Sequence, residues 1–263
     1  MKNGNGIPNG AFEFAGKLAR DAGKFLHSRF TRPAVRGRWK GLRHLQIQED
    51  RLTDALIRKR IRKAFPDHTL TTEESGTSGR QAYRWIVDPL DGTHNYARRM
   101  PWYCVSIALV RGDEFLVGAL DFPEFGWTLT AAKGRGAFLN GKPLRVSRVR
   151  DLMKACVAFD SGLTSTSLHA KTLIPVANAV FLMRMTGSTA MNLALVAMGK
   201  ADIFMDFDSY AWDHAAGVLI VREAGGIVTS INGVPVRPDS AEIIATNGIL
   251  HDKTLKLLRR ITR

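Results

Sequence analysis

Two aspartates, three residues apart, are the side chains of this sequence best suited to metal chemistry. Asp88 and Asp91 lie within the run Trp-Ile-Val-Asp-Pro-Leu-Asp-Gly-Thr-His-Asn-Tyr over residues 85–96. The apolar residues before Asp88 predict the end of a buried strand, Pro89 is expected to stop its ladder pairing, and Gly92 is expected to open a helix. Carboxylates for a hard cation beside backbone N–H groups for an anion are the parts of a phosphoryl-transfer site.

Two further acidic junctions favour this interpretation over an ordinary turn with a capping aspartate. Glu73 and Glu74 follow residues 67–72, whose alternating side chains are typical of a short strand. Asp213 stands at the beginning of a small-residue helix predicted over 211–224, with a glycine after its end. Each of the three segments therefore places an acid where a regular element begins or ends.

At these three places the sequence resembles the inositol monophosphatase family of magnesium-dependent, lithium-sensitive sugar phosphatases. The family patterns are Glu-Glu, Asp-Pro-Ile/Leu-Asp-Gly-Thr and Trp-Asp-x-Ala-Ala-Gly, and the chain carries them in this order at 73–74, 88–93 and 212–217. The similarity extends from Phe12 to about Ile249. It implies an α/β (α+β) fold, the layered αβαβα sandwich of the inositol monophosphatase and fructose-1,6-bisphosphatase type.

The resemblance also implies roles for the acidic residues. Glu73, Asp88 and the backbone carbonyl of Leu90 would hold one Mg²⁺ ion. Asp88, Asp91 and Asp213 would hold a second, so that Asp88 bridges the two. Magnesium in such a site offsets the charge of a phosphomonoester, activates water and stabilises the leaving alkoxide.

The same resemblance implies the residues that act on water and phosphate. The Thr93 hydroxyl and Glu73 would orient and deprotonate the attacking water, while the N–H groups of Gly92 and Thr93 would bind phosphate oxygens. Asp50 matches a family acid that helps to bind a third metal ion or holds the catalytic threonine, although it could equally be a helix cap. The run Gln-Ile-Gln-Glu-Asp over 46–50 departs from the family's Val-Thr-x-x-Asp and leaves the third ion open.

Substrate contacts are expected from a second group of residues. Gly187, Ser188 and Thr189 match the turn whose backbone and hydroxyl meet the sugar. Asp206 stands seven residues before Asp213, where inositol-specific members place a longer glutamate. The alternatives are that Ser188 and Thr189 cap the following helix and that Asp206 is a solvated strand end.

An arginine-rich segment over 31–44 is predicted to be a loop, too long and too charged for a plain connector. In the resembling family this region is a mobile loop beside the active site. Lys40 matches a family lysine near the phosphate, and Arg38 and Arg43 compete for that assignment.

Hydrophobic periodicity predicts two N-terminal helices, then an antiparallel meander, then alternating strands and helices. The helices are expected at 12–26, 52–65, 167–179, 189–198, 211–224 and 251–261, and the strands at 103–110, 115–120, 128–132, 138, 155–159, 180–185 and 203–207. A single domain over 1–263 is expected. Its possible subdomains are 11–150, with the metal ligands, and 151–263, on the substrate side.

Charge leaves a second kind of ligand open. The 263 residues carry a net charge of +14, concentrated toward both ends of the chain. Such charge attracts anionic substrates or nucleic acid. An ordinary solvated surface is favoured, since Leu255, Leu258 and Ile261 give the basic tail an amphipathic helix and no nucleic-acid-binding motif is present. A small phosphate ester is thus the expected ligand, and a homodimer the expected assembly.

No apolar run approaches the ~20 residues of a membrane span, and the first ten residues lack a signal peptide's apolar stretch. A cytoplasmic protein is therefore expected. Cys104 and Cys156, the only cysteines, stand in apolar strand-like settings and are predicted to be buried thiols.

Three functions follow. The first is hydrolysis of myo-inositol monophosphate or a related sugar phosphate. The second is hydrolysis of another small ester, such as fructose 1,6-bisphosphate, histidinol phosphate or a 3′-phosphonucleotide; His94-Asn95-Tyr96 after the Asp-Gly-Thr motif mildly favours the sugar. The third is an RNA- or protein-binding regulator on the same fold. Clustered acids argue against it, because they are costly to keep together without cations.

Overall fold

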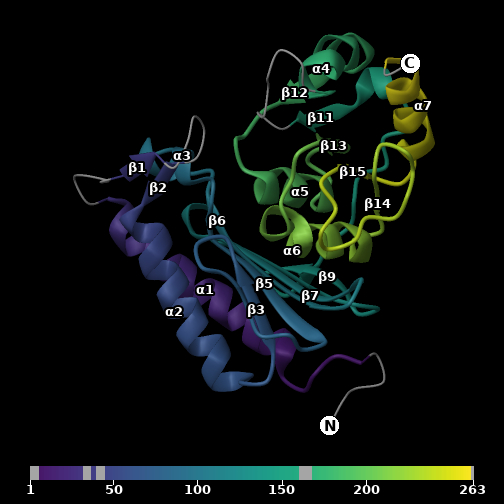
Figure 1. Cartoon of the computed structure of the whole chain (residues 1–263). Coiled ribbons are helices and arrows are strands. Elements are labelled where there is room, and N and C mark those ends of the chain that lie inside the picture. Colours follow the sequence, from purple (N-terminus) through teal and green to yellow (C-terminus); the bar gives the residue numbers. More distant parts are fainter. Residues whose placement is uncertain (1–5, 32–36, 40–44, 160–167, 262–263) are drawn as a thin grey trace.

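Helices and sheets alternate in five layers in the computed structural model, which describes residues 6–31, 37–39, 45–159 and 168–261. Figure 1 shows the order: α1 and α2, an eight-stranded sheet, α5 and α6, a five-stranded sheet, and then α4 and α7. The predicted αβαβα sandwich is confirmed. None of the described helices is both long enough and apolar enough to cross a membrane.

The outer pair of helices, α1 (Ala11–Phe30) and α2 (Gln48–Ala64), lies on one face of the larger sheet. Apolar residues at helical spacing make one buried stripe on α1, whereas the buried face of α2 is polar in its first turns and apolar only at Ile57 and Ile61. On α1 this stripe includes Leu18, Ala22 and Leu26, all fully buried. Both predicted helices are confirmed, and each is longer than its apolar stripe.

The larger sheet has the strand order β10-β9-β8-β7-β6-β5-β3-β4 and is antiparallel except for the β3–β5 pair. Its strands are β3 (Thr69–Thr72), β4 (Gly76–Ser78), β5 (Tyr83–Asp91), β6 (Cys104–Arg111), β7 (Glu114–Phe122), β8 (Trp127–Ala132), β9 (Gly136–Leu139) and β10 (Lys142–Pro143). The predicted meander is confirmed, whereas the short edge strands β4 and β10 were not predicted.

Strand β5 does not stop at Pro89, contrary to the prediction. Asp88 pairs with Ser106 and Asp91 pairs with Cys104, so three steps along β5 face two steps along β6. The extra residue is a β-bulge, where proline's missing N–H costs no ladder bond. The bulge lets the strand continue and carry both aspartates.

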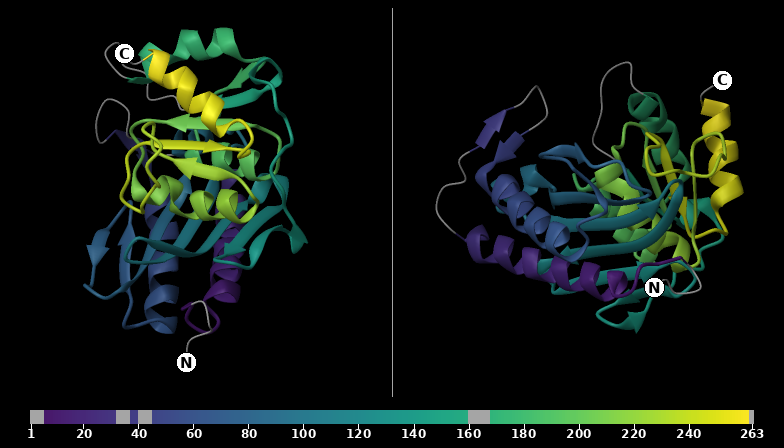
Figure 2. Two further views of the ribbon diagram at one scale, coloured as in Figure 1. Left: turned by 90° about the vertical axis from the view of Figure 1, so that its right-hand side faces the viewer. Right: turned by 60° about the horizontal axis from the view of Figure 1, so that its bottom comes forward.

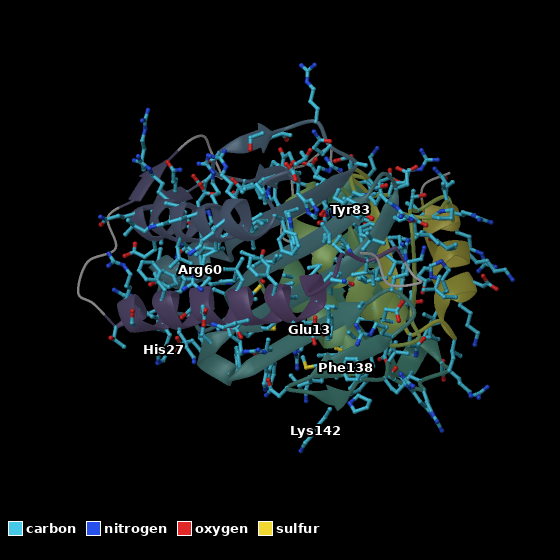
Figure 3. The ribbon with its side chains drawn as sticks, turned by 90° about the horizontal axis from the view of Figure 1, so that it is seen from below. Glu13, His27, Arg60, Tyr83, Phe138 and Lys142 are labelled. Atoms are coloured by element: carbon cyan, nitrogen blue, oxygen red, sulfur yellow. The ribbon has the colours of Figure 1, made fainter. Side chains whose placement is uncertain are left out.

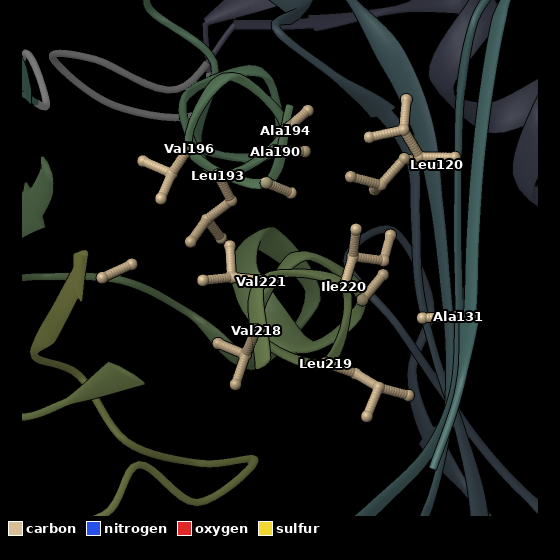
Figure 4. Packing of buried hydrophobic residues seen from close by; sticks show 14 of the residues in the cluster. Leu120, Ala131, Ala190, Leu193, Ala194, Val196, Val218, Leu219, Ile220 and Val221 are labelled. Atoms are coloured by element: carbon tan, nitrogen blue, oxygen red, sulfur yellow. The ribbon is translucent and has the colours of Figure 1, made fainter. Parts of the chain in front are cut away.

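The middle layer consists of α5 (Thr189–Ala197) and α6 (Ala211–Glu223), which lie between the two sheets (Figure 2). Figure 4 shows α6 side chains, including Leu219 and Ile220, packed toward Leu120 and Ala131 of the larger sheet. The helix approaches β7 very closely at Gly118, where an added Cβ would lie 2.6 Å from a backbone oxygen of α6.

The smaller sheet has the order β12-β11-β13-β15-β14. Its strands are β11 (Cys156–Phe159), β12 (Leu182–Arg184), β13 (Ile203–Asp206), β14 (Ile227–Thr229) and β15 (Ile243–Thr246), and α4 (Leu168–Ala179) and α7 (His251–Ile261) cover its outer face. The first three strands and both helices were predicted. A subdomain boundary near residue 150 stays a prediction. Helix α6 lies beyond that residue in the sequence and packs on the larger sheet.

The segment predicted as a long loop contains a strand. Residues Gly37–Trp39 form β1, which pairs antiparallel with β2 (Leu45–Ile47). Arg38 is on β1, whereas Lys40 and Arg43 lie outside the described residues, so the choice among these cations stays a prediction. The prediction of two buried thiols holds only for Cys104, because Cys156 is partly exposed; both are free.

Candidate metal and phosphate site

Four carboxylates from distant parts of the chain lie within electrostatic range of one another. Burial raises the pKa of Asp88 well above its ordinary value, and the negative charges of Glu73, Asp91 and Asp213 raise it further. A set of acids that oppose one another's ionisation in a buried place is the arrangement that a cation relieves. Acids of all three sequence motifs thus lie near enough for their charges to act on one another.

Strand pairing brings Glu73 to the aspartates. Thr72, the last residue of β3, is the parallel partner of Val87 on β5, and the N–H of Glu73 donates to the Val87 carbonyl at 3.2 Å. Because parallel strands end at the same edge of a sheet, Glu73 leaves β3 beside Asp88.

A local hydrogen bond fixes the first aspartate. The N–H of Leu90 donates to Oδ1 of Asp88 at 2.9 Å, and both residues are buried. This bond turns the carboxylate back along the bulge. The carbonyl of Leu90 accepts a hydrogen bond from the Thr93 hydroxyl at 3.0 Å.

Three donors hold the second aspartate. Oδ2 of Asp91 accepts hydrogen bonds from the Ser188 hydroxyl, from the N–H of Ala190 at 3.2 Å and from the Cys104 thiol at 3.7 Å. Burial nevertheless raises the pKa of Asp91 to about 7, since it outweighs these donors and the Glu73 charge adds to it. Two of these donors, Ser188 and Ala190, come from the start of α5. The end of β5 and the start of α5 therefore meet at this carboxylate.

The first turn of α6 carries Asp213. Its Oδ2 accepts the N–H of Tyr210 at 2.8 Å, which satisfies one of the unpaired donors at the helix start. Burial raises the pKa of Asp213 well above its ordinary value, and the charges of Asp91, Glu73 and Asp206 contribute to the same shift.

Thr93 and Asp50 form a linked pair. The Thr93 hydroxyl lies 3.2 Å from Oδ1 of Asp50, while Oδ2 of Asp50 accepts the N–H of Ile47 at 2.6 Å at the start of α2. Asp50 thus both caps a helix and contacts the predicted catalytic threonine, so the two alternatives coexist. Burial raises its pKa to about 8, and the charges of Glu74 and Glu73 add to this.

Gly92 joins β5 to the short helix α3 (Thr93–Ala97) in a conformation that favours glycine. Its φ is +83°, and an added Cβ would lie 2.6 Å from the carbonyl oxygen of Trp102. The residue therefore combines a left-handed backbone with a close approach that excludes larger side chains.

The predicted sugar-side residues adjoin the acids. Ser188 caps α5, since its hydroxyl accepts the N–H of Met191 at 3.1 Å, and it also donates to Asp91. Thr189 lies 3.4 Å from Oδ2 of Asp206, and Gly187 precedes both in an exposed turn. Asp206 is only 2% exposed, so the solvated-strand-end alternative is wrong.

Sequence reasoning missed Asn95, which ties the two parts of the site together. Its amide nitrogen donates to the carbonyls of Trp102 at 2.8 Å, Thr186 at 2.9 Å and Gly187 at 3.3 Å. Its neighbour His94 is half-buried and lies 3.3 Å from the Arg98 guanidinium. In the sequence, only the position of Asn95 two residues after the Asp-Gly-Thr motif could have pointed to it.

The donor set fits magnesium rather than a softer metal, because the neighbouring groups are carboxylate, carbonyl and hydroxyl oxygens. Among the described side chains, no three acidic, histidine or cysteine groups converge as a finished ligand cluster. Magnesium does not need one, since it keeps several waters and is commonly bound by one or two carboxylates together with substrate phosphate.

A five-layer αβαβα sandwich with buried acids beside an Asp-Gly-Thr turn defines a class of small-molecule phosphatase folds. Residues 11–263 match the model of the inositol monophosphatase family. The chain belongs to that family.

Similar proteins carry two kinds of name. The chain is 37% identical over 225 residues to a fructose-1,6-bisphosphatase/inositol-1-monophosphatase of Aquifex aeolicus, with 84% of each protein covered. It is 38% identical over 224 residues to the Nus factor SuhB of Escherichia coli K12, which covers 82% of this chain and 84% of that protein. The extragenic suppressor protein SuhB of Bartonella henselae has a similar structure, with a TM-score of 0.90, 33% identity and coverage of 94% and 98%.

Proposed function

We propose that the protein is a magnesium-dependent phosphomonoesterase whose preferred substrate is myo-inositol monophosphate or a related sugar phosphate. The observation that carries this proposal is that Glu73, Asp91 and Asp213 lie near enough to the buried Asp88 for their negative charges to raise its pKa. Membership of a phosphatase family supports it.

The carboxylates and one carbonyl would hold two Mg²⁺ ions. Glu73, Asp88 and the Leu90 carbonyl would serve one position, and Asp88, Asp91 and Asp213 the other. When bound, magnesium offsets phosphate charge, lowers the pKa of water and stabilises the leaving oxygen. Asp50 would hold Thr93, and the same proposal leaves open a third Mg²⁺ position at its carboxylate.

Protein groups would orient the water and the ester. The Thr93 hydroxyl has two acceptors for its single proton, Oδ1 of Asp50 and the Leu90 carbonyl, so its lone pairs are available to accept a hydrogen bond from water. Glu73 stands on the neighbouring strand end and would take the proton that water loses. The N–H groups of Gly92 and Thr93 would bind phosphate oxygens.

The sugar would lie against the turn before α5. The backbone of Gly187 and the hydroxyl of Thr189 offer hydrogen-bonding groups, and Asp206, buried behind them, would act on the sugar by positioning the Thr189 hydroxyl. Ser188 is already engaged by Asp91, so it would act by positioning the carboxylate. A short aspartate at 206 would leave room for esters bulkier than inositol.

Phosphate release with Mg²⁺ tests the proposal. The substrates to compare are inositol 1-phosphate, fructose 1,6-bisphosphate, histidinol phosphate and a 3′-phosphonucleotide, with and without EDTA. Asp88→Asn and Asp213→Asn should lower turnover by about 10³-fold or more, because each removes a charge that holds the cation. Asp252→Asn, an exposed acid on α7, is the matched control. Full activity in either site variant would contradict the proposal, and a preference for another ester would change the assigned substrate.

A regulatory role is the second candidate, and the 38% identity to the Nus factor SuhB favours it. The net charge of +14 would support binding to RNA. Titration of RNA into the Asp91→Asn variant at low and high salt tests this role separately from catalysis. Binding that weakens steeply with salt would support it, and absence of binding at low salt would exclude the RNA-binding form.

We also propose a homodimer in the cytoplasm. Sedimentation velocity would measure the first and cell fractionation the second. A monomer across micromolar concentrations would contradict the proposed assembly.

A further inference from the structure

A cavity lies away from the carboxylate site, between α1 and the β8–β9 hairpin. It has a volume of 510 Å³, within the range of small-molecule sites. In Figure 3, Glu13 of α1 and Phe138 of β9 lie close together, at the opposite end of α1 from His27. The cavity is lined by Phe12, Glu13, Gly16, Arg20, Thr130, Arg135, Phe138 and Gly141, and none of these belongs to the proposed catalytic group.

Two cations line this cavity without a hydrogen-bonded carboxylate. Within the described part of the chain, neither Arg20 nor Arg135 forms a hydrogen bond or an ion pair. Arg20 lies within electrostatic range of Asp121, and Arg135 stands over the ring of Phe12 at 5.1 Å. Exposed Arg60, by contrast, pairs with Asp21 at 3.1 Å. The guanidinium groups of Arg20 and Arg135 keep their donors for a ligand.

A hydrogen-bonded turn holds Arg135 in place. Glu223, at the end of α6, accepts two hydrogen bonds of 2.8 Å: the N–H of Gly134 donates to Oε1 and the N–H of Gly136 donates to Oε2. Both glycines have positive φ, +71° and +83°, so the backbone on either side of Arg135 is fixed in a tight bend. The arginine is therefore presented by a rigid turn, which lowers the entropy cost of binding.

Two aromatic rings supply the apolar part. Phe12 and Phe138 are both partly exposed and belong to the cavity wall, and Arg135 covers the ring of Phe12. Exposed rings beside unpaired guanidinium groups suit a flat ligand that stacks on a ring and carries an anion. An adjoining cavity of 300 Å³ shares Arg20 and adds Lys24, whose charges both act on Asp121 in the same wall.

We propose that this cavity binds a small molecule of mononucleotide size that carries an aromatic ring and a phosphate-type anion. The ring would stack against Phe138, since Arg135 already covers the ring of Phe12. The anion would accept hydrogen bonds from Arg20 and Arg135, and Glu13 would accept from an amino or hydroxyl group of the ligand. This inference does not depend on the proposed phosphatase activity.

Calorimetric titration with 1-naphthylmethylphosphonate tests the site, because its P–C bond resists hydrolysis. Two proteins are titrated with Mg²⁺ present, the unaltered protein and its Asp91→Asn variant. The variant separates binding in the cavity from binding at the carboxylate site. Arg135→Gln and Phe138→Ala should each weaken binding by about tenfold or more, since each removes a charge-assisted hydrogen bond or a stacking surface. Arg148→Gln, an exposed arginine elsewhere, should leave the affinity unchanged.

Three results would overturn the proposal. One is the absence of binding at millimolar probe. Another is an affinity that Arg135→Gln and Phe138→Ala both leave unchanged. The third is binding that disappears in Asp91→Asn, which would assign the probe to the carboxylate site. Melting curves of the cavity variants show that any loss of binding does not come from unfolding.

Discussion

The hydroxyl of Ser188 donates a hydrogen bond to Oδ2 of Asp91, a residue 97 positions earlier in the chain. The same oxygen of Ser188 caps α5 by accepting the N–H of Met191. One side chain therefore stabilises the start of a helix in the middle layer and orients a carboxylate of the larger sheet. The link makes the geometry of the site depend on the packing between these layers.

Ser188→Ala should lower both stability and activity. Loss of the cap and of one buried hydrogen bond is expected to cost about 1–3 kcal/mol in the free energy of unfolding. Turnover should fall while some activity remains, because the N–H of Ala190 still donates to Asp91. Urea unfolding and phosphate release measure the two effects, and Ser188→Thr, which keeps the hydroxyl, is the control. Unchanged stability and turnover in the alanine variant would contradict the structural link.

Thr93→Ala should lower kcat by roughly 10²- to 10⁴-fold, the usual effect of removing a group that orients or moves a proton. The hydroxyl is the group that joins Asp50 to the Leu90 carbonyl, and alanine has no replacement for it. Thr93→Ser keeps the hydroxyl and should retain most of the activity. Steady-state phosphate release measures both variants, and equal loss in serine and alanine would argue for a packing role of the methyl group instead.

Removal of metal should make stability fall as pH rises. The folded-state pKa of Asp91, about 7, lies above its ordinary value of 3.8, so the buried charged form is disfavoured. This penalty is absent below pH 4 and grows until the carboxyl is fully ionised above pH 7. Melting temperature in EDTA should therefore decline from pH 5 to pH 8.

Added Mg²⁺ should reverse that decline, because an ion that binds only the folded state stabilises it by about 2.7 kcal/mol at a hundred times its dissociation constant. The Asp88→Asn variant should show a weaker response to Mg²⁺. A melting temperature that is the same with EDTA and with Mg²⁺ at pH 8 would be inconsistent with the proposed cation site.

Asp121→Asn should stabilise the protein at high pH. Asp121 is 6% exposed, and burial raises its pKa from 3.8 to about 6. Its ionised form is thus penalised above pH 6 and not below pH 4, so an uncharged amide should gain up to about 3 kcal/mol at pH 8 and little at pH 4. The amide oxygen can still accept from Thr128, which now donates at 2.6 Å. Urea unfolding at both pH values measures the gain, with the exposed Asp67→Asn as control; a gain equal at both would point to a cause other than titration.

Local periodicity was sufficient for the long elements. Apolar residues at helical spacing predicted α1, and alternating or continuous apolar runs predicted β6 and β7, because each pattern leaves one way to bury its side chains. Strands β14 and β15 escaped prediction since they are three and four residues long and follow glycine-containing or polar segments. β15 pairs with β13 on one side and with β14 on the other, and no local pattern indicates such a pairing.

The acids of the site were predicted by motif, but their mutual arrangement was not available from sequence. The continuation of β5 through Pro89 depends on a bulge that only the partner strand defines. Asn95 binds Thr186 and Gly187 across about ninety residues, and Glu223 holds the turn at Gly134 across a similar separation. Such contacts follow from the packing of layers, and a single sequence contains no periodic signal for them.

The position of α5 and α6 between the sheets has a consequence during synthesis. All strands of the larger sheet lie before residue 144, yet the helices that cover its second face begin only at Thr189. A ribosome must therefore translate tens of further residues before α5 and α6 can pack on this apolar sheet face. During this interval the nascent chain is most prone to aggregation.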